Sequence, residues 1–306
     1  MADKIYRGMA TGSGLLTLVI LCLIGVFLVI RALPAFRQMG FAFLTTTKWQ
    51  PDGLTHQFGI AALLYWTAVI AVIALVIAIP VSIACALFIN EYAPRALYRP
   101  LTALVDLLAA IPSVIFGIWG FAFLEPQLVS TSSWLDQNLG FIPIFKVESG
   151  NVAGSAFIAG VVVSLMVQPI LTSVVREVFS QTPAGEKEAA LALGSSRWGM
   201  IRAVVLPFGR GGIIGGTMLG LGRALGETIA VALIISPSTI ISIHVLQSGA
   251  NSIAATIALQ FGEASQQFGI PALMAAGVSL FAVTLIVNFL ASLVVARSRS
   301  GRGVEI

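Results

Sequence analysis

An arginine and a glutamate stand four residues apart inside an otherwise apolar stretch of this sequence. Arg223 and Glu227 belong to the segment LGRALGET, within a glycine-rich run long enough to cross a membrane. A charged side chain near the bilayer centre costs about 2.5–3.5 kcal/mol on insertion scales, and such residues mark substrate or ion paths by default. Residues four apart on a helix share a face, so the two side chains can meet. The pair is predicted to line a translocation path; the alternative is a self-contained ion pair that helps helices to pack.

Three other polar residues lie within apolar stretches. Asp106 is close to the inner end of its stretch, where it can reach headgroups or water, so a structural role is favoured over a role in the path. Pro112 removes one helical hydrogen bond, and the expected kink places Ser113 on the path. Gln168, followed by Pro169, repeats this pattern. Ser113 and Gln168 are therefore secondary candidates.

The composition is that of a polytopic membrane protein. Of 306 residues, 58% are hydrophobic and 10% are charged, and the mean hydropathy is +0.98; a soluble enzyme is excluded. The net charge of +4 is spread among apolar runs, which favours a membrane surface over nucleic acid as the partner. Cys22 and Cys85 lie in apolar segments without metal-ligand spacing, so buried thiols are expected and no metal site.

Six stretches are long and apolar enough to form transmembrane helices. The positive-inside rule puts most Lys and Arg residues in the cytoplasm if both termini lie there. A basic tail, with Arg299 and Arg302, is expected to flank the membrane and meet its lipid. The sequence thus predicts an all-α polytopic membrane protein, a single domain over residues 1–306. The expected spans are about 14–33, 60–89, 101–124, 152–175, 212–236 and 271–296.

The span 212–236 contains five glycines around the charged pair. Their small-xxx-small spacings allow close helix approach, and a continuous helix offers no free amides to bind an anion. We expect them to pack this helix against its counterpart in a partner subunit. The glycines are Gly215, Gly216, Gly220, Gly222 and Gly226.

A long polar segment separates the fourth and fifth spans. Over residues 183–207, the run EKEAALAL is followed by Gly194 and Ser195, and then by RWGMIRAVVL, which Pro207 is expected to end. This pattern predicts a helix, a turn and a second helix outside the bilayer. Its apolar face indicates docking to a protein, or else an interfacial helix on headgroups.

This segment resembles the EAA loop of the permeases of binding-protein-dependent ABC importers. The spacing fits throughout, with Val204 in place of the usual isoleucine. The resemblance implies a type I importer permease (MetI-like) core, whose loop forms coupling helices that seat in an ATP-binding subunit. The matching residues are Glu188, Ala189, Ala190, Gly194, Leu206 and Pro207.

Four further segments are similar to phosphate permeases of the PstC type, rather than to the sister PstA type: KWQPDGLTHQFGI, INEYAP, LLAAIPSVIFGIWG and GTMLGLGRALGETIAVALI. This similarity implies half of an ATP-driven phosphate importer in a prokaryotic cell membrane. The implied partners are a PstA-like permease, two PstB-like ATP-binding subunits and a PstS-like phosphate-binding protein. Because the chain has no GxxxxGK[ST], ATP and Mg²⁺ are expected only on the partner subunits, with no cofactor bound here and no catalysis by this chain.

Phosphate also fits the chemistry of the charged pair. The planar guanidinium of Arg223 can give two parallel hydrogen bonds to a tetrahedral anion. Glu227 either competes for the arginine, which would help release, or accepts a hydrogen bond from the protonated oxygen of hydrogen phosphate, which sulfate lacks. Three alternatives are a permease for sulfate or molybdate, an ATP-independent secondary anion transporter or channel, and, least favoured, a scaffold protein.

Overall fold

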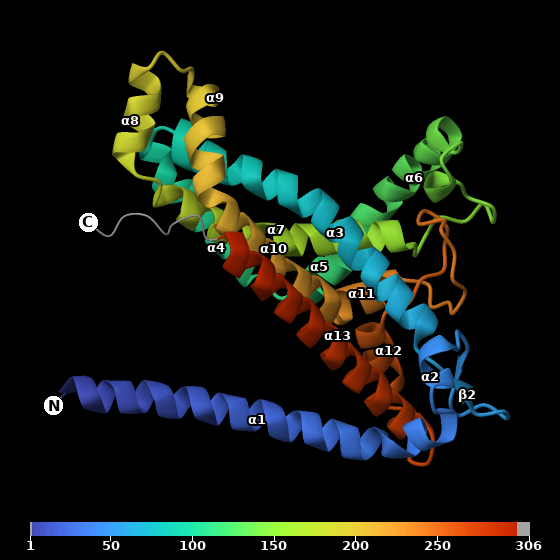
Figure 1. The fold of residues 1–306 in the computed structure, drawn as a ribbon. Coiled ribbons are helices and arrows are strands. Elements are labelled where there is room, and N and C mark those ends of the chain that lie inside the picture. Colours follow the sequence, from blue (N-terminus) through green and yellow to red (C-terminus); the bar gives the residue numbers. More distant parts are fainter. Residues whose placement is uncertain (1, 299–306) are drawn as a thin grey trace.

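The computed structural model describes residues 2–298, and six helices in this part of the chain are long and apolar enough to cross a membrane. Figure 1 shows them as a bundle from which α1 diverges. The basic tail with Arg299 and Arg302 lies outside the described residues. In chain order, the elements before the coupling loop are α1 (Ala2–Met39), α2 (Ala42–Thr45), β1 (Trp49–Gln50), β2 (Gln57–Phe58), α3 (Ala61–Leu87), α4 (Arg95–Ala110), α5 (Ser113–Trp119), α6 (Glu125–Leu139) and α7 (Ala156–Ser180).

After α7 come α8 (Ala184–Ala192), α9 (Arg197–Met200), α10 (Leu206–Gly226), α11 (Ile229–Ile234), α12 (Ile253–Gln260) and α13 (Gly269–Ser298). Three π-helical turns continue or join these helices: η1 (Phe88–Tyr92), η2 (Gly120–Leu124) and η4 (Ile201–Val205). A short 3-10 turn, η3 (Pro143–Phe145), follows α6, and β1 pairs antiparallel with β2. The prediction of an all-α membrane protein is confirmed.

The core of the bundle is built around α7. This helix packs against α3, α10 and α4 and is the most enclosed of the six long helices. Most of its residues are buried, whereas the other long helices bury a smaller share of theirs. The hydroxyl of Ser155 accepts a hydrogen bond from the Ile158 amide (3.4 Å) and caps the start of α7. The central position of α7 means that α3 and α10 are both fixed relative to it.

The first helix lies largely apart from the bundle. It contacts α13, and its buried residues Ala32 and Ala35 stand near the end that joins α2 (Figure 1). The apolar residues from Leu15 to Ile24 are exposed. Cys22 is among them as a free thiol, so the expectation of burial is wrong for Cys22; the Cys85 thiol, also free, is partly buried.

The expected span 101–124 is not one helix. α4 ends at Ala110, and Ile111 and Pro112 are extended, with ψ angles of 129° and 140°. Proline disfavours helical backbone at the residue before it, which explains a complete break where the sequence predicted a kink. The helix of membrane-spanning length instead runs from Ser113 to Leu139 through η2 and α6. The connection expected at 125–151 is therefore helical over its first half.

The expected span 212–236 is also interrupted. α10 ends at Gly226, Glu227 is extended with ψ 126°, and α11 begins at Ile229. In the other direction the helix is continuous from Arg197 to Gly226, so Pro207 does not end it. The π turn η4 precedes this proline, and the Leu206 amide bonds to the Ile201 carbonyl five residues back. Such a wider turn accommodates the missing proline donor.

The glycines of α10 face α7 of the same chain. A β-carbon added at Gly212 would lie 2.3 Å from Val178 Cγ2, and one at Gly220 would lie 2.7 Å from Val167 Cγ1. The expectation that these glycines face a partner subunit is thus wrong for Gly216 and Gly220, which pack on α7. Gly215 and Gly226, by contrast, have open space where a β-carbon would stand.

The coupling segment has the predicted form of helix, turn and helix. Gly194 makes the turn between α8 and α9 with φ +85°, a left-handed conformation that favours glycine. Ser196 caps α9 by accepting a hydrogen bond from the Gly199 amide (3.1 Å). In Figure 1 this hairpin projects from one end of the bundle, and the strands and the loops that flank α6 and α12 lie at the other.

Candidate functional site

The two helix breaks lie at the same level of the bundle. α5 and α11 pack against each other, with a β-carbon at Gly117 placed 2.8 Å from Ala230 Cα and one at Gly120 placed 3.3 Å from Ile234 Cδ1. The later glycine contacts the later residue of α11, so the two helices run parallel. Ser113 begins α5 one turn before Gly117, and Glu227 and Thr228 directly precede α11, so both breaks lie at the amino-terminal side of this helix pair.

Arg223 occupies the last turn of α10, where the carbonyl end of the helix favours a positive charge. Its side chain is half-buried, and its Nε is buried without a hydrogen-bond partner in the structure. No carboxylate of the described residues lies within ion-pair distance of it. The guanidinium is therefore positioned by the helix but unpaired within the described part of the chain.

Glu227 is the first residue after α10 and is only 7% exposed. Among the described residues it makes no ion pair or side-chain hydrogen bond, and because it lies beyond the end of α10 it does not share a helical face with Arg223. The self-contained pair considered from the sequence is thus absent. The amides of Glu227 and Thr228 also donate no hydrogen bond within residues 2–298. Irregular backbone at membrane depth persists only where it is enclosed by protein or lines a cavity.

The remaining polar candidates are separated by the structure. Ser113 begins α5 and is half-buried beside the break. Gln168 instead lines a largely apolar, open cavity of about 790 Å³ between α3, α4, α5 and α7. Asp106 is exposed on α4 and accepts a hydrogen bond from the Ser173 hydroxyl at 3.4 Å. Of these three residues, only Ser113 lies at a helix break, as Glu227 does.

The EAA residues are distributed over two surfaces. Glu188 and Ala189 are exposed on α8, whereas Ala190 packs against the buried cluster that includes Phe179 and Ile201. Leu206 and Pro207 are half-buried at the start of α10. Large apolar side chains are also exposed here, namely Leu191, Leu193 and Trp198. The sequence pattern signalled an apolar face without identifying these three residues.

Sequence reasoning missed the polar contacts at the end of α3. Glu91 in η1 pairs with Lys187 of α8, and the Arg197 guanidinium of α9 stands 5.2 Å from the centre of the Tyr92 ring. The Asn90 side chain donates to the Arg176 carbonyl at 2.7 Å. These contacts join segments about one hundred residues apart, and no local pattern signals them.

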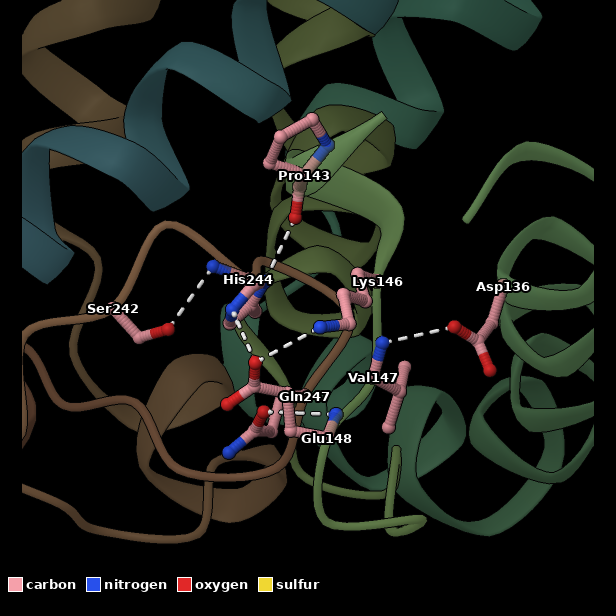
Figure 2. Close-up of polar contacts among 8 residues, drawn as sticks. All are labelled: Asp136, Pro143, Lys146, Val147, Glu148, Ser242, His244 and Gln247. Atoms are coloured by element: carbon pink, nitrogen blue, oxygen red, sulfur yellow. Dashed lines mark hydrogen bonds and ion pairs between the residues drawn. The ribbon is translucent and has the colours of Figure 1, made fainter. Parts of the chain in front are cut away.

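At the opposite end, two loops are joined by polar contacts, as Figure 2 shows. His244 contacts the Pro143 carbonyl through Nδ1 (2.7 Å) and faces Glu148 through Nε2 (3.6 Å). Lys146 pairs with the same carboxylate at 3.2 Å. The loops after α6 and after α11 therefore form one connected platform.

Comparison with known families matches residues 78–300 to the family described as "Binding-protein-dependent transport system inner membrane component". This match covers the chain from the last third of α3 onward, including both breaks and the coupling hairpin.

Curated relatives align along almost the whole chain. The Phosphate transport system permease protein PstC 2 of Mycobacterium tuberculosis is 42% identical over 291 residues, which cover 94% of this chain and 89% of the relative. The Phosphate transport system permease protein PstC of Haemophilus influenzae is 38% identical over 306 residues, with 98% and 95% covered.

Solved structures share the fold at lower identity. A bacterial ABC transporter involved in the import of the acidic polysaccharide alginate matches with a TM-score of 0.59 and 20% identity, covering 96% of this chain and 98% of that chain. The MetNI methionine ABC transporter in an inward-facing conformation matches with a TM-score of 0.52 and 19% identity, covering 78% and 94%.

Proposed function

Because the chain belongs to the binding-protein-dependent transport system inner membrane components, a family of multi-pass proteins of the prokaryotic plasma membrane, we propose that it is a permease subunit of an ATP-driven phosphate importer. One observation carries the proposal: a chain similar at 42% identity to a phosphate permease holds an unpaired arginine beside a break in a membrane helix. The chain forms half of the path and needs a homologous, PstA-like permease for the other half.

Arg223 binds the phosphate oxygens in this proposal, and Glu227 tunes the site. Arginine suits a tetrahedral anion because its planar fork gives two parallel hydrogen bonds. The break adds the amides of Glu227 and Thr228, which donate no hydrogen bond within residues 2–298 and suit an anion as well. Ser113, at the break before α5, supplies a hydroxyl. The expectation that the backbone here is unavailable rested on a continuous helix over 212–236, but the helix ends at Gly226 and a new one begins at Ile229.

ATP acts through partner subunits. The exposed EAA residues Glu188 and Ala189, with the apolar Leu191, Leu193 and Trp198 beside them, form the surface that docks to PstB-like ATPases, which bind ATP and Mg²⁺. Both termini and the hairpin then lie in the cytoplasm, as the distribution of basic residues favours. The platform of Figure 2 faces outward, where a PstS-like binding protein delivers phosphate.

Two other functions make different predictions. A sulfate or molybdate importer would show no preference for a protonated oxyanion. An ATP-independent anion transporter or channel would move the anion with this chain alone and without nucleotide. The exposed coupling hairpin favours the ATP-driven importer over the second alternative.

The test is ATP-dependent phosphate uptake by the full complex in liposomes. Arg223→Ala is expected to lower uptake by roughly 100-fold or more, because charged hydrogen bonds contribute about 1.5–3 kcal/mol each. Arg223→Lys keeps the charge but not the fork, so it retains a small part of the uptake. Arg99→Ala, an exposed arginine on α4, is the matched control and keeps wild-type uptake. Normal uptake by an assembled Arg223→Ala complex would refute the site.

A further inference from the structure

The end of α3 holds both helices of the coupling hairpin. Glu91, whose side chain is 7% exposed, pairs with Lys187 Nζ at 2.5 Å, and the lysine side chain is 21% exposed. Lys187 immediately precedes the EAA sequence on α8. Removing one partner from such an enclosed pair leaves an uncompensated charge, so a change at Glu91 alone disturbs the contact between η1 and α8.

The neighbouring residue holds the second helix. The ring of Tyr92 lies under the guanidinium of Arg197, the first residue of α9, in a cation–π contact. Consecutive residues of η1 thus contact the two sides of the Gly194 turn. Below them, Leu87 of α3 shares a buried apolar cluster with Phe179, Ile201 and Val205. The hairpin is therefore fixed to α3, besides its covalent connections to α7 and α10.

The other end of α3 is fixed to the opposite face of the protein. The Tyr65 hydroxyl donates to the Ser242 carbonyl (2.8 Å), and Trp66 Nε1 donates to the Ile240 carbonyl (2.9 Å). Ser242 precedes His244 in the platform of Figure 2, and its hydroxyl accepts a hydrogen bond from the His244 amide. From Tyr65 to Glu91, the helix spans about 39 Å at a rise of ~1.5 Å per residue.

We propose that α3 is the element that links the outer platform to the coupling hairpin, with Glu91 and Tyr92 as its positioning residues at the hairpin. The inference rests on the proposed function and goes beyond it by assigning the route. A displacement of the platform moves α3 together with the core helix α7 against which it packs, and the Glu91–Lys187 and Tyr92–Arg197 contacts pass this displacement to the surface that docks to the ATPase. Binding of the phosphate-loaded binding protein at the platform thereby changes the position of the hairpin that docks to the ATPase.

The test measures ATP hydrolysis by the full complex in liposomes, with and without phosphate-loaded binding protein. Glu91→Gln is expected to lower the stimulation by the loaded binding protein at least fivefold while the unstimulated rate stays within twofold of wild type. The reversed pair Glu91→Lys with Lys187→Glu restores at least half of the stimulation. Tyr92→Phe, which keeps the ring, stays near wild type, whereas Tyr92→Ala behaves like Glu91→Gln. Glu177→Gln, an exposed carboxylate near the same end of α7, is the control.

A second measurement does not depend on transport. In the complex, hydrogen exchange of residues 184–196 is expected to be faster in Glu91→Gln than in wild type and in the reversed pair. Wild-type stimulation in an assembled Glu91→Gln complex, or a reversed pair no better than the single variant, would overturn the proposal. If wild type hydrolyses ATP but moves no phosphate, the proposed function fails, while the exchange result still decides whether α3 holds the hairpin.

Discussion

Within residues 2–298, charged residues have partners at the end of α3 that contacts the hairpin of α8 and α9, but not at the break after α10. At the end of α3, Glu91 has Lys187 and Tyr92 has Arg197, each within the same chain. At the break after α10, Arg223 and Glu227 are at least half-buried and have no ionic partner among the described residues. An unpaired buried charge is unfavourable unless something else compensates it. The charges at the end of α3 are therefore compensated within the subunit, whereas Arg223 and Glu227 require a ligand or another subunit to compensate them.

The strongest way to sharpen this comparison is to neutralise Glu227. Glu227→Gln is expected to lower the preference for phosphate over sulfate by about 10–100-fold, because an amide can donate to an unprotonated oxyanion that a carboxylate repels. The measurement is ATP-dependent uptake of each anion by the reconstituted complex. An unchanged preference would show that Glu227 does not accept a hydrogen bond from the protonated phosphate oxygen. Its remaining role would then be to weaken the binding of phosphate by Arg223.

A second prediction concerns the two sides of α10. Gly212→Ala places a β-carbon against Val178, and overpacking of this kind costs about 1–3 kcal/mol, so the melting temperature of the purified chain should fall by several degrees. Gly215→Ala meets open space and gains helix propensity, so it should leave the melting temperature unchanged or raise it. Equal melting temperatures for the two variants would contradict the packing of this face on α7.

The smallest expected effect is at the outer end, at Asp52. Partial burial acts to raise the pKa of Asp52. Hydrogen bonds from the Ser265 hydroxyl and amide, and from the Gly269 amide, outweigh this effect and lower the pKa below its ordinary value of 3.8. The carboxylate therefore stabilises the fold fully above this ordinary value, and the contribution is lost as the pH falls through the lower folded value.

The melting temperature of the wild type is expected to fall between about pH 5 and pH 3 as Asp52 is protonated. In Asp52→Asn this fall should be smaller, by less than about 2 °C because the side chain is exposed. Glu263→Gln, an exposed carboxylate of the same region, serves as the control. An identical pH dependence in Asp52→Asn and wild type would contradict the shift.

Much of this architecture was predictable from the sequence, because long apolar runs and a turn glycine are local signals. The number of long helices and the hairpin around Gly194 follow from them, whereas the bounds of the third and fifth helices do not. The break at Pro112 also had a local signal, since proline restricts the residue before it. The break at Glu227 had a weaker one, in Gly226, because the apolar run IAVALI continues beyond it. The new helix after this break, α11, packs on α5, and a tertiary contact of this kind leaves no periodic pattern in the sequence.

The roles at the site were predictable only in part. The type and spacing of Arg223 and Glu227 marked an anion path, and the EAA spacing marked the hairpin, and both assignments stay predictions. The Glu91–Lys187 pair was out of reach, since its partners are 96 residues apart and each has an ordinary polar setting in the sequence.

The close approach of α5 and α11 has a mechanical consequence. At Gly117 no methyl group fits between the two backbones, so the helices cannot slide past each other by a side-chain length without separating. Displacing either helix therefore carries the other with it, so the two breaks that precede α5 and α11 are mechanically joined.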